Sequence, residues 1–396
     1  MTMRDRWLLP EGVDEILPPR AAELEQLCRE VIDLYAGWGY ELVIPPLIEF
    51  LDSLLTGTGS DLDIQTFKLT DQLTGRLMGL RADTTPQVAR IDAHKLKRDI
   101  PTRLCYLGTV VHTRPESTGD SRCPLQVGAE LYGHDGVESD AEVLCLMLET
   151  LKLVGQQSPY VDLGHMRIVR ALVDAAGLDN DQTDQLFDVL QRKAAVELDA
   201  MLAQWSLAKK HTTAIRALIE LNGNTDILKD ARKSLASGGN AVTQAIDELQ
   251  QLIDIVSARY PDVNFYIDPA ELRGYHYHTG VMFAAYVEGQ GAGVAYGGRY
   301  NDIGRSFGRA RPATGFSVDL KRLLALHEAV QGVTPGIIAP WSSDTALNSL
   351  VAELRGQGER VIIQLPGAET GAAELGCDRQ IVEKNGKWQV VKAHNK

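Results

Sequence analysis

Polar side chains that could hold a small molecule recur within VVHTRPESTGDSRCPLQVGAELYG, residues 110–133. The segment is typical of a strand, a charged loop and a second strand. In the second strand Gln126 and Glu130 alternate with Val127 and Leu131, so the amide and the carboxylate share one face. Such a face is either solvated or the floor of a pocket.

Further charged and polar residues accompany two other predicted strand segments, RADTT at 81–85 and LRGYHYHT at 272–279. A strand would place Arg81, Asp83 and Thr85 on one face, and Thr85 would cap the helix that follows. Arginine pairs with carboxylates, acidic residues accept from ammonium groups, and amides or phenols orient polar side chains. A solvated face would explain each charge singly. Together with the pocket-type residues on the same strands, the charges favour an amino-acid site. The charged residues are Arg81, Asp83, Arg114, Arg122, Glu130 and Arg273, and the pocket-type residues are Thr85, Gln126 and Tyr277.

Two motifs are compatible with a metal or a cofactor but favour neither. His276 and His278 share one side of a strand, yet zinc needs three or four ligands and no third follows at useful spacing, so we expect no metal. The glycine-rich residues 289–298 lack the lysine of a P-loop and the strand-to-helix order of a dinucleotide site. We therefore expect a hairpin turn there, and no cofactor.

The elements that position these residues follow from periodicity. Apolar residues at helical spacing predict a helix from residue 23 to Gly37, followed by a strand at 41–44. A hairpin is expected across residues 71–75. The stretch 141–260 is almost entirely helical in pattern, with breaks that include GQQSPYVDLGH. Near the end we expect a short β-α-β unit and a hairpin turning at residues 385–386.

Bulk composition bounds the class of protein. With 396 residues the chain exceeds one typical core, and 44% hydrophobic with 23% charged residues is ordinary for a globular protein. Five scattered cysteines without a C-x-x-C favour reduced thiols in the cytoplasm, and no membrane span or secretory signal is visible. The net charge of −13 disfavours nucleic acid as a partner, although a local basic patch can hide in an acidic total.

Five ordered segments resemble the class II aminoacyl-tRNA synthetases, specifically their histidyl branch. The helix and strand ending at Pro45 resemble motif 1, which forms dimers, and residues 110–133 resemble motif 2. LRADTTPQVAR, LRGYHYHTGVMF and the run from GGRYNDI to DLKRL resemble the other histidyl segments and motif 3. The resemblance implies an α+β fold: a core over residues 1–330 with an antiparallel sheet flanked by helices, a mainly helical insertion at about 165–260, and a small C-terminal α/β domain at 333–396.

The same resemblance implies a pocket for L-histidine. Asp83 takes the place of the glutamate that meets the amino group, and Arg273 that of the arginine facing the carboxylate. Tyr277 keeps the first aromatic of the specific segment, the second position being His278, and Arg322 matches the motif 3 arginine. The implied histidine-binding residues are Asp83, Thr85, Arg122, Gln126, Glu130, Arg273, Tyr277 and His278.

Two departures argue against synthetase activity. Where the synthetases carry F-R-x-E-R-P, with an arginine on the α-phosphate, this chain reads Val110 to Pro115, with Val111 at the arginine position and Thr113 at the glutamate position. Loss of a positioned guanidinium removes several kcal/mol of transition-state stabilisation, about 3 kcal/mol for a comparable donor. Only about 64 residues follow the core, fewer than an anticodon-binding domain needs, so we expect no tRNA binding and no catalytic residues.

That combination resembles the regulatory subunits of hetero-oligomeric ATP phosphoribosyltransferase, whose G-Y-H-Y-x-T-G and R-A-D-x-T-P-Q-V-A-R patterns fit residues 274–280 and 81–90. The resemblance implies a cytoplasmic, non-catalytic homodimer that docks onto short-form catalytic subunits in a hetero-octamer. There it would raise their activity and mediate feedback inhibition by L-histidine, as an allosteric ligand, at the first step of histidine biosynthesis. A divergent histidyl-tRNA synthetase, with Arg114 or His112 replacing the lost arginine, and a free-standing histidine sensor stay open as alternatives.

Overall fold

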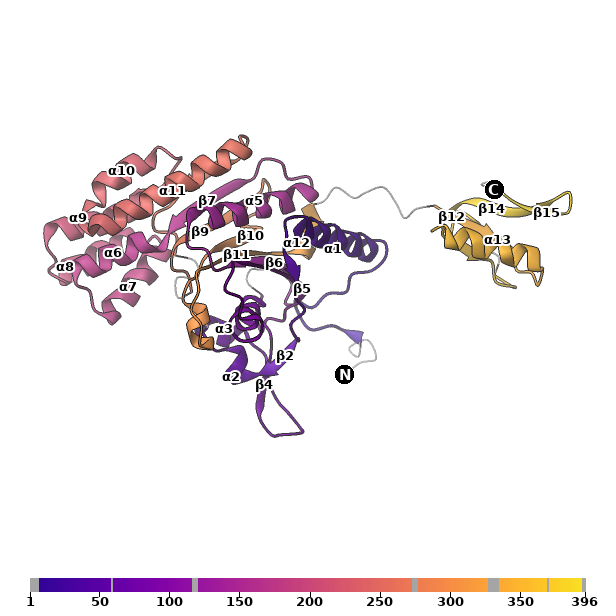
Figure 1. Cartoon of the computed structure of the whole chain (residues 1–396), viewed down its shortest axis with the longest axis horizontal. Helices are drawn as coiled ribbons and strands as arrows, with labels where there is room; N and C mark the ends of the chain where they lie inside the picture. The colour runs from indigo at the N-terminus through magenta and orange to yellow at the C-terminus, as the bar shows by residue number, and fades with distance from the viewer. Residues whose placement is uncertain are drawn as a thin grey trace. The chain divides into compact units, whose positions relative to one another are not determined.

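The computed structural model describes residues 7–57, 60–115, 120–272, 277–326, 335–368 and 370–393. Its internal contacts divide the chain into two compact units (Figure 1). The first comprises residues 1–16 and 21–328, and the second residues 17–20 and 329–396. Each unit has a sheet of its own, and the larger unit also contains a second, smaller sheet.

An eight-stranded sheet organises the first unit. Its strands pair antiparallel in the centre, whereas the two outermost pairs, β1 with β5 and β7 with β8, are parallel. In spatial order the strands are β1 (Glu41–Leu42), β5 (Thr102–Thr109), β6 (Leu125–Tyr132), β11 (Ala313–Asp319), β10 (Ala295–Arg299), β9 (Val281–Tyr286), β7 (Tyr160–His165) and β8 (Asn264–Ile267). The hairpin expected at residues 289–298 is confirmed, because β9 and β10 pair antiparallel across that turn.

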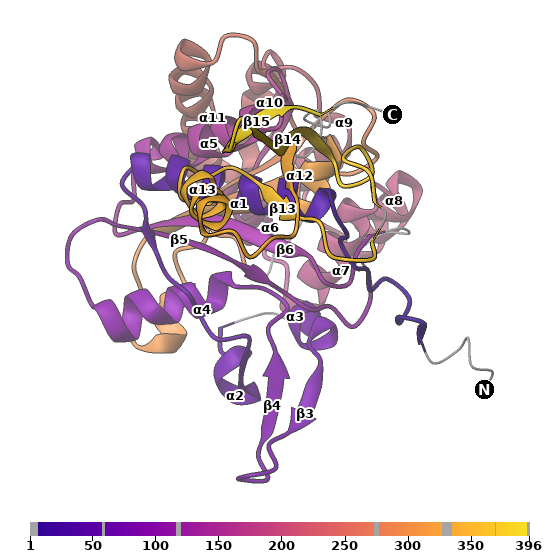
Figure 2. The ribbon, with the colours of Figure 1, turned by 90° about the vertical axis from the view of Figure 1, so that its right-hand side faces the viewer.

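One face of this sheet is apolar and lies under helices (Figure 2). Val127, Ala129 and Leu131 of β6 belong to this core, as the alternation in the sequence predicts. The Phe316 ring of β11 meets the Tyr35 ring of α1 edge to face at 6.0 Å between centroids. The covering helices are α1 (Arg20–Gly37), α5 (Val137–Leu153), α11 (Gly239–Arg259) and α12 (Leu320–Leu326).

The opposite face carries the polar residues and a smaller core. Val88 and Ala89 pack there with Leu104 and the Tyr106 ring, so the short helix that holds them is fixed to the sheet. The elements on this side are α4 (Thr85–Arg90), η2 (Ile91–Leu96), η4 (Ile303–Phe307), α2 (Leu51–Leu54), α3 (Ser60–Gln65) and a three-stranded sheet of β2 (Ile48–Phe50), β4 (Leu77–Leu80) and β3 (Lys68–Thr70) (Figure 2).

The expectation that Arg81 and Asp83 share a strand face is wrong. Strand β4 ends at Leu80, and the chain turns before α4 begins. The Arg81 side chain explains the turn, because its buried guanidinium donates to the backbone carbonyls of Pro45 and Thr109, each at 2.9 Å. A side chain that ties two other segments together overrides the period-two pattern of its own segment.

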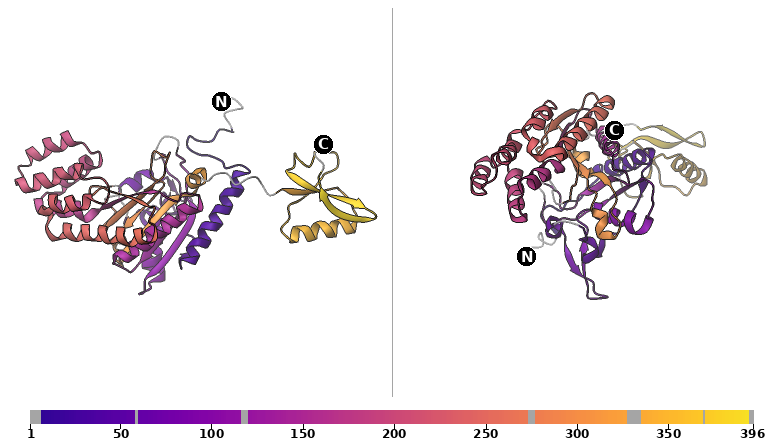
Figure 3. Two further views of the ribbon diagram at one scale, coloured as in Figure 1. Left: turned by 90° about the horizontal axis from the view of Figure 1, so that it is seen from above. Right: turned by 60° about the vertical axis from the view of Figure 1, so that its left-hand side comes forward.

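A group of helices follows β7 in the chain, and they lie beside one another (Figure 3). The reading of GQQSPYVDLGH as a mere break is wrong: β7 runs between β9 and β8, with Val161 and Leu163 fully buried. The helices are α6 (Met166–Ala176), α7 (Asn180–Gln191), α8 (Ala195–Gln204), α9 (Lys209–Glu220), α10 (Ile227–Ser234) and η3 (Ala236–Gly238), before α11. Within the described ranges, no helix is both long enough and apolar enough to span a bilayer.

The second unit has its own four-stranded sheet, ordered β13, β12, β14 and β15. The β-α-β expectation is confirmed by β12 (Gly336–Ala339), α13 (Thr345–Gly356) and β13 (Val361–Ile363), with the two strands parallel. The last hairpin pairs β14 (Cys377–Lys384) with β15 (Lys387–Lys392). It turns at Asn385 and Gly386, both with positive φ, as an Asn-Gly hairpin turn requires.

A buried ion pair joins the sheet to the start of α5. The Arg299 guanidinium donates to Asp140 Oδ2 at 2.9 Å and 3.1 Å, and the two side chains are only 5% and 4% exposed. Burial raises the pKa of Asp140 even though the guanidinium lowers it. Desolvation of the Asp140 carboxylate therefore outweighs its attraction to the Arg299 guanidinium. Removing one member of such a buried pair is strongly destabilising.

We expect Asp140→Asn to lower the free energy of unfolding by about 3 kcal/mol, because the buried Arg299 then loses its only buried partner among the described carboxylates and keeps just the exposed Asp135, 3.4 Å away. Urea denaturation measures this change. The control is Asp188→Asn, which breaks an exposed pair with Arg192 and should change stability by less than about 1 kcal/mol. Equal effects of the two substitutions would contradict the interpretation.

Candidate functional site

The candidate site lies on the polar face of the large sheet, where β5, β6 and β11 run side by side. Their register sets Gln126 opposite Gly108, Gly128 opposite Tyr106, and Glu130 opposite Gly315. Directly paired residues in an antiparallel sheet point to the same side. Each of these three large polar side chains, Tyr106, Gln126 and Glu130, therefore has a glycine across from it.

Two of these glycines are required by space. A Cβ added at Gly128 would overlap the Tyr106 hydroxyl, and one added at Gly315 would overlap the Glu130 carboxylate. The Phe316 carbonyl of β11 also lies close to the Gly128 position, and the Ala129 carbonyl of β6 lies close to the Gly315 position. The glycines thus let an aromatic and an acidic side chain lie flat over the sheet.

A chain of hydrogen bonds begins at Asp83. Its Oδ1 accepts from the Gln126 side-chain amide at 2.8 Å and from the Thr85 backbone and hydroxyl at 3.1 Å and 3.2 Å. The other end of the Gln126 amide accepts from the Thr84 backbone at 2.9 Å. Helix α4 starts at Thr85, so the N-cap is Thr84 and the expected capping role of Thr85 is wrong. The Thr85 hydroxyl is engaged in the site.

The series of hydrogen bonds continues through Tyr106 to Glu130, which a second tyrosine also contacts. The Thr85 hydroxyl lies 3.1 Å from that of Tyr106, which donates to Glu130 Oε1 at 3.2 Å. Tyr300 donates to Glu130 Oε2. We call Asp83, Thr85, Tyr106, Gln126, Glu130 and Tyr300 the polar network.

The carboxyl group of Glu130 is the most deeply buried acid of the network, with 1% of the residue exposed. Burial raises its pKa to about 8, the Tyr300 hydrogen bond opposes that rise, and the nearby charge of Asp83 adds to it. The carboxyl group is therefore predominantly protonated at neutral pH. A neutral acid can both donate and accept hydrogen bonds.

Two residues of the specific segment, Tyr277 and His278, lie against the network. The Tyr277 ring stacks on Tyr300 with 4.7 Å between centroids, and the His278 ring meets Tyr277 edge to face at 5.3 Å. Among the described residues the buried Tyr277 hydroxyl and His278 Nδ1 have no hydrogen-bond partner. Burial lowers the pKa of His278 to about 4, so its ring is neutral.

Two arginines are expected at the site, and only Arg122 lies among the described residues. The Arg122 guanidinium donates to the backbone carbonyls of Glu11 and His112, each at 3.1 Å, and lies over the Phe67 ring. None of these contacts is with the polar network. Arg273 lies outside the described residues. The structure therefore brings together Asp83, Thr85, Gln126, Glu130, Tyr277 and His278.

Sequence reasoning missed Tyr106 and Tyr300, which both bond to Glu130. Tyr106 carried a weak signal, since it alternates with Cys105 and Leu107 in a strand that otherwise looks buried. Tyr300 had none of its own, because a tyrosine just after a glycine-rich strand is ordinary. Only the register of β10, β11 and β6 places it near the acid.

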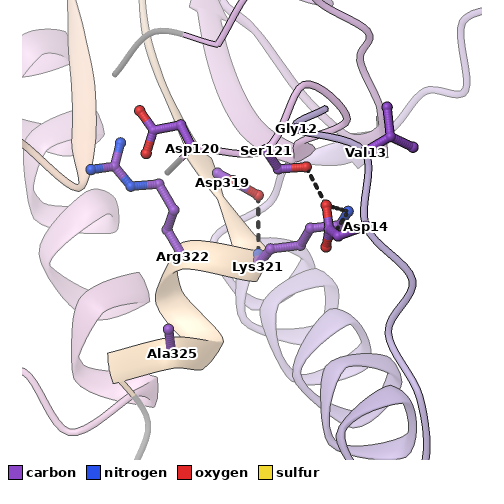
Figure 4. A pocket seen from close by; sticks show the side chains of 9 residues that line it. All are labelled: Gly12, Val13, Asp14, Asp120, Ser121, Asp319, Lys321, Arg322 and Ala325. Carbon is purple, nitrogen blue, oxygen red and sulfur yellow. Dashed lines mark hydrogen bonds and ion pairs between the residues drawn. The ribbon is translucent and has the colours of Figure 1, made fainter. Parts of the chain in front are cut away.

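The expected motif 3 arginine lines a pocket of about 480 Å³ next to the network (Figure 4). Asp319 stands opposite Gln126 in the β11–β6 register, and its Oδ1 accepts from the backbones of Leu125 and Lys321, each at 3.0 Å. The pocket is lined by Gly12, Val13, Asp14, Asp120, Ser121, Asp319, Lys321, Arg322 and Ala325.

The segment that lacks the synthetase arginine is held by its backbone. Val111 donates its amide to the Arg81 carbonyl at 3.0 Å. The neighbouring His112 is 7% exposed, and its Nε2 lies 2.8 Å from the Ala82 carbonyl. That ring is therefore already used in holding the turn before Asp83.

Comparisons with known proteins agree on a family. Residues 12–323 match the family model Histidyl-tRNA synthetase, and residues 334–391 match ATP phosphoribosyltransferase subunit HisZ C-terminal domain. An ATP phosphoribosyltransferase regulatory subunit from Thioalkalivibrio sulfidiphilus is 57% identical over 393 residues, which cover 99% of this chain and 100% of that protein.

Solved structures agree on the fold. An ATP phosphoribosyltransferase regulatory subunit/histidyl-tRNA synthetase from Bacillus halodurans has a TM-score of 0.81 at 26% identity, covering 93% of this chain and 95% of that one. A histidyl-tRNA synthetase from Nostoc sp. PCC 7120 has a TM-score of 0.77 at 18% identity, covering 98% and 97%. The expected class II synthetase-like α+β fold is confirmed.

The raised pKa of Glu130 predicts a pH dependence of stability. Its folded pKa of about 8 exceeds the ordinary 4.5, so its contribution is fully present below pH 4.5 and is lost as the pH rises through about 8. Glu130→Gln is neutral at every pH. We expect the variant to gain stability relative to the native chain between about pH 5 and about pH 9, measured by urea denaturation. Parallel stability profiles for the two proteins would contradict the raised pKa.

Proposed function

Because this chain belongs to the family of ATP phosphoribosyltransferase regulatory subunits, we propose that it raises the activity of a short-form catalytic subunit and mediates feedback inhibition by L-histidine. The family expected from the sequence is confirmed. In this proposal ATP and phosphoribosyl pyrophosphate react on the partner chain, and the two chains form a hetero-octamer. The signal is the occupancy of one site by histidine, coupled to the partner's activity.

The polar network is the proposed histidine site, and one observation carries that assignment. The buried Tyr277 hydroxyl, which has no hydrogen-bond partner among the described residues, lies beside a buried network that contains two acidic groups. A polar atom left unpaired in a protein interior costs free energy, about 1–3 kcal/mol, which a ligand can recover by bonding to it.

The network suits the groups of histidine in their order along the ligand. Asp83 is the carboxylate placed to accept from the ammonium group, and Gln126 and Thr85 hold its oxygen in position. Glu130 and the Tyr277 hydroxyl are the proposed partners of the imidazole, which needs one donor and one acceptor when neutral. Arg273 remains the proposed partner of the ligand carboxylate from the sequence resemblance.

The positions around Val111 support a regulatory role over a synthetase. An α-phosphate would need a cation at Val111, and the nearest histidine, His112, is engaged with the Ala82 carbonyl. Arg81 has its guanidinium on two backbone carbonyls. These contacts leave both side chains committed to structure rather than to a phosphoryl group.

The motif 1 region supports self-association. Strand β1 lies at the edge of the large sheet, so no described strand pairs with one side of its backbone. Apolar side chains on and after this strand are exposed, among them Leu42 at 47% and Ile44 at 81%. We propose that a second copy of the chain covers them, giving the homodimer expected from the sequence.

Replacing Asp83 tests the histidine site. Asp83→Asn keeps the shape and the acceptor oxygen but removes the charge opposite the ligand ammonium. We expect histidine affinity to fall by about 2 kcal/mol, roughly thirtyfold in Kd, by isothermal titration calorimetry. The control is Asp254→Asn, an exposed carboxylate of α11 that should leave the affinity unchanged. Native affinity in Asp83→Asn would remove Asp83 from the site.

Phosphoribosyl-ATP formation by the short-form catalytic subunit tests the regulatory role. We expect the rate to rise when this chain is added and to fall again with histidine, because histidine occupancy and activation are coupled. Asp83→Asn should activate equally but need more histidine for reversal. A chain without effect in either condition would contradict regulation, and histidine-dependent pyrophosphate exchange by the chain alone would favour a divergent synthetase.

A further inference from the structure

An open surface depression of about 660 Å³ lies on the group of helices, away from the polar network. Its lining residues come from the start of α9, the end of α10 and η3, elements that contact one another. Helices α9 and α10 are labelled in Figure 1. We call it the lysine pocket, after the lining residues Lys209, Lys210, Thr213, Lys233, Ser234 and Ser237.

Among the residues that the structure describes, the three lysines of this pocket form no ion pair, whereas neighbouring cations do. Five neighbouring cations each lie within salt-bridge distance of a carboxylate: Arg192, Lys193, Arg216, Lys229 and Arg232. Across the described part of the chain, no carboxylate pairs with Lys209, Lys210 or Lys233. Three like charges around one concavity repel one another, and a chain with a net charge of −13 does not gather them by composition alone.

Uncharged donors line the same pocket. Helix α9 begins after Ala208, which offers no side-chain acceptor to the first amides of the helix. Those amides and the positive end of the helix dipole favour an anion. The Ser237 hydroxyl oxygen is buried without a hydrogen-bond partner among the described residues, so this end of the pocket has unused hydrogen-bonding capacity.

We propose that the lysine pocket binds the phosphate groups of a small phosphorylated metabolite. Three ammonium groups, hydroxyl donors and a helix N-terminus form a donor set with no acidic member, which matches an oxyanion carrying two or more charges. A single concave site suits a compact ligand, whereas a polynucleotide needs cations spread along its backbone. This ligand would be distinct from the histidine held at the polar network.

Pyrophosphate is the probe for this site, and the full chain is the protein to use. We expect calorimetry to detect binding of pyrophosphate that is tighter than that of sulfate and weakens with added salt. Lys209→Gln combined with Lys233→Gln should raise the Kd about tenfold or more, because two charge-assisted contacts are lost. Ser237→Ala should weaken binding by a smaller factor.

Lys229→Gln is the matched control, since Lys229 lies on the same helix α10 but pairs with Asp226 outside the pocket. Its pyrophosphate affinity should equal that of the native chain, and thermal denaturation should show all variants folded. Absence of pyrophosphate binding, or equal losses in the double variant and the control, would overturn the proposal. A single-stranded RNA that displaces pyrophosphate at lower concentration would also overturn it, by assigning the pocket to a polynucleotide.

Discussion

The burial of one carboxyl group, that of Glu130, is the constraint on which the polar face depends. A carboxyl group in a dry interior needs hydrogen-bond donors and favours its neutral form. Tyr106 and Tyr300 supply the donors, and their rings also build the small core that fixes α4. Site and core on this face are therefore one structure, and Asp83 enters it through Thr85.

Periodicity and turn chemistry predicted the parts of the fold that local forces decide. The alternation of β6 correctly separated the apolar side, with Val127, from the side that carries Glu130. The Asn385–Gly386 turn follows from the two positive φ angles that such a hairpin needs. The Asp83 carboxylate and the Gln126 amide could be assigned to one site from the sequence, because each belongs to a segment with a recognisable motif.

Long-range contacts decided what the sequence did not reveal. The Arg81 guanidinium binds carbonyls more than 25 positions away in either direction, and it ends a strand that alternation would extend. Tyr300 reaches Glu130 only because β10, β11 and β6 adopt one particular register. Strand β7 was not predicted, because its short apolar alternation lies next to Gly and Pro residues that usually mark a loop.

The glycines across from the polar network also limit which inherited substitutions this site tolerates. Any missense change in the codon for Gly128 or Gly315 adds at least a Cβ, and that atom would overlap the Tyr106 hydroxyl or the Glu130 carboxylate. The side chains of the proposed histidine site can therefore be displaced by alleles that leave every one of those residues unaltered. In a population survey, variants at these two codons belong with those of the proposed binding residues, although neither glycine has a side chain that could contact a ligand.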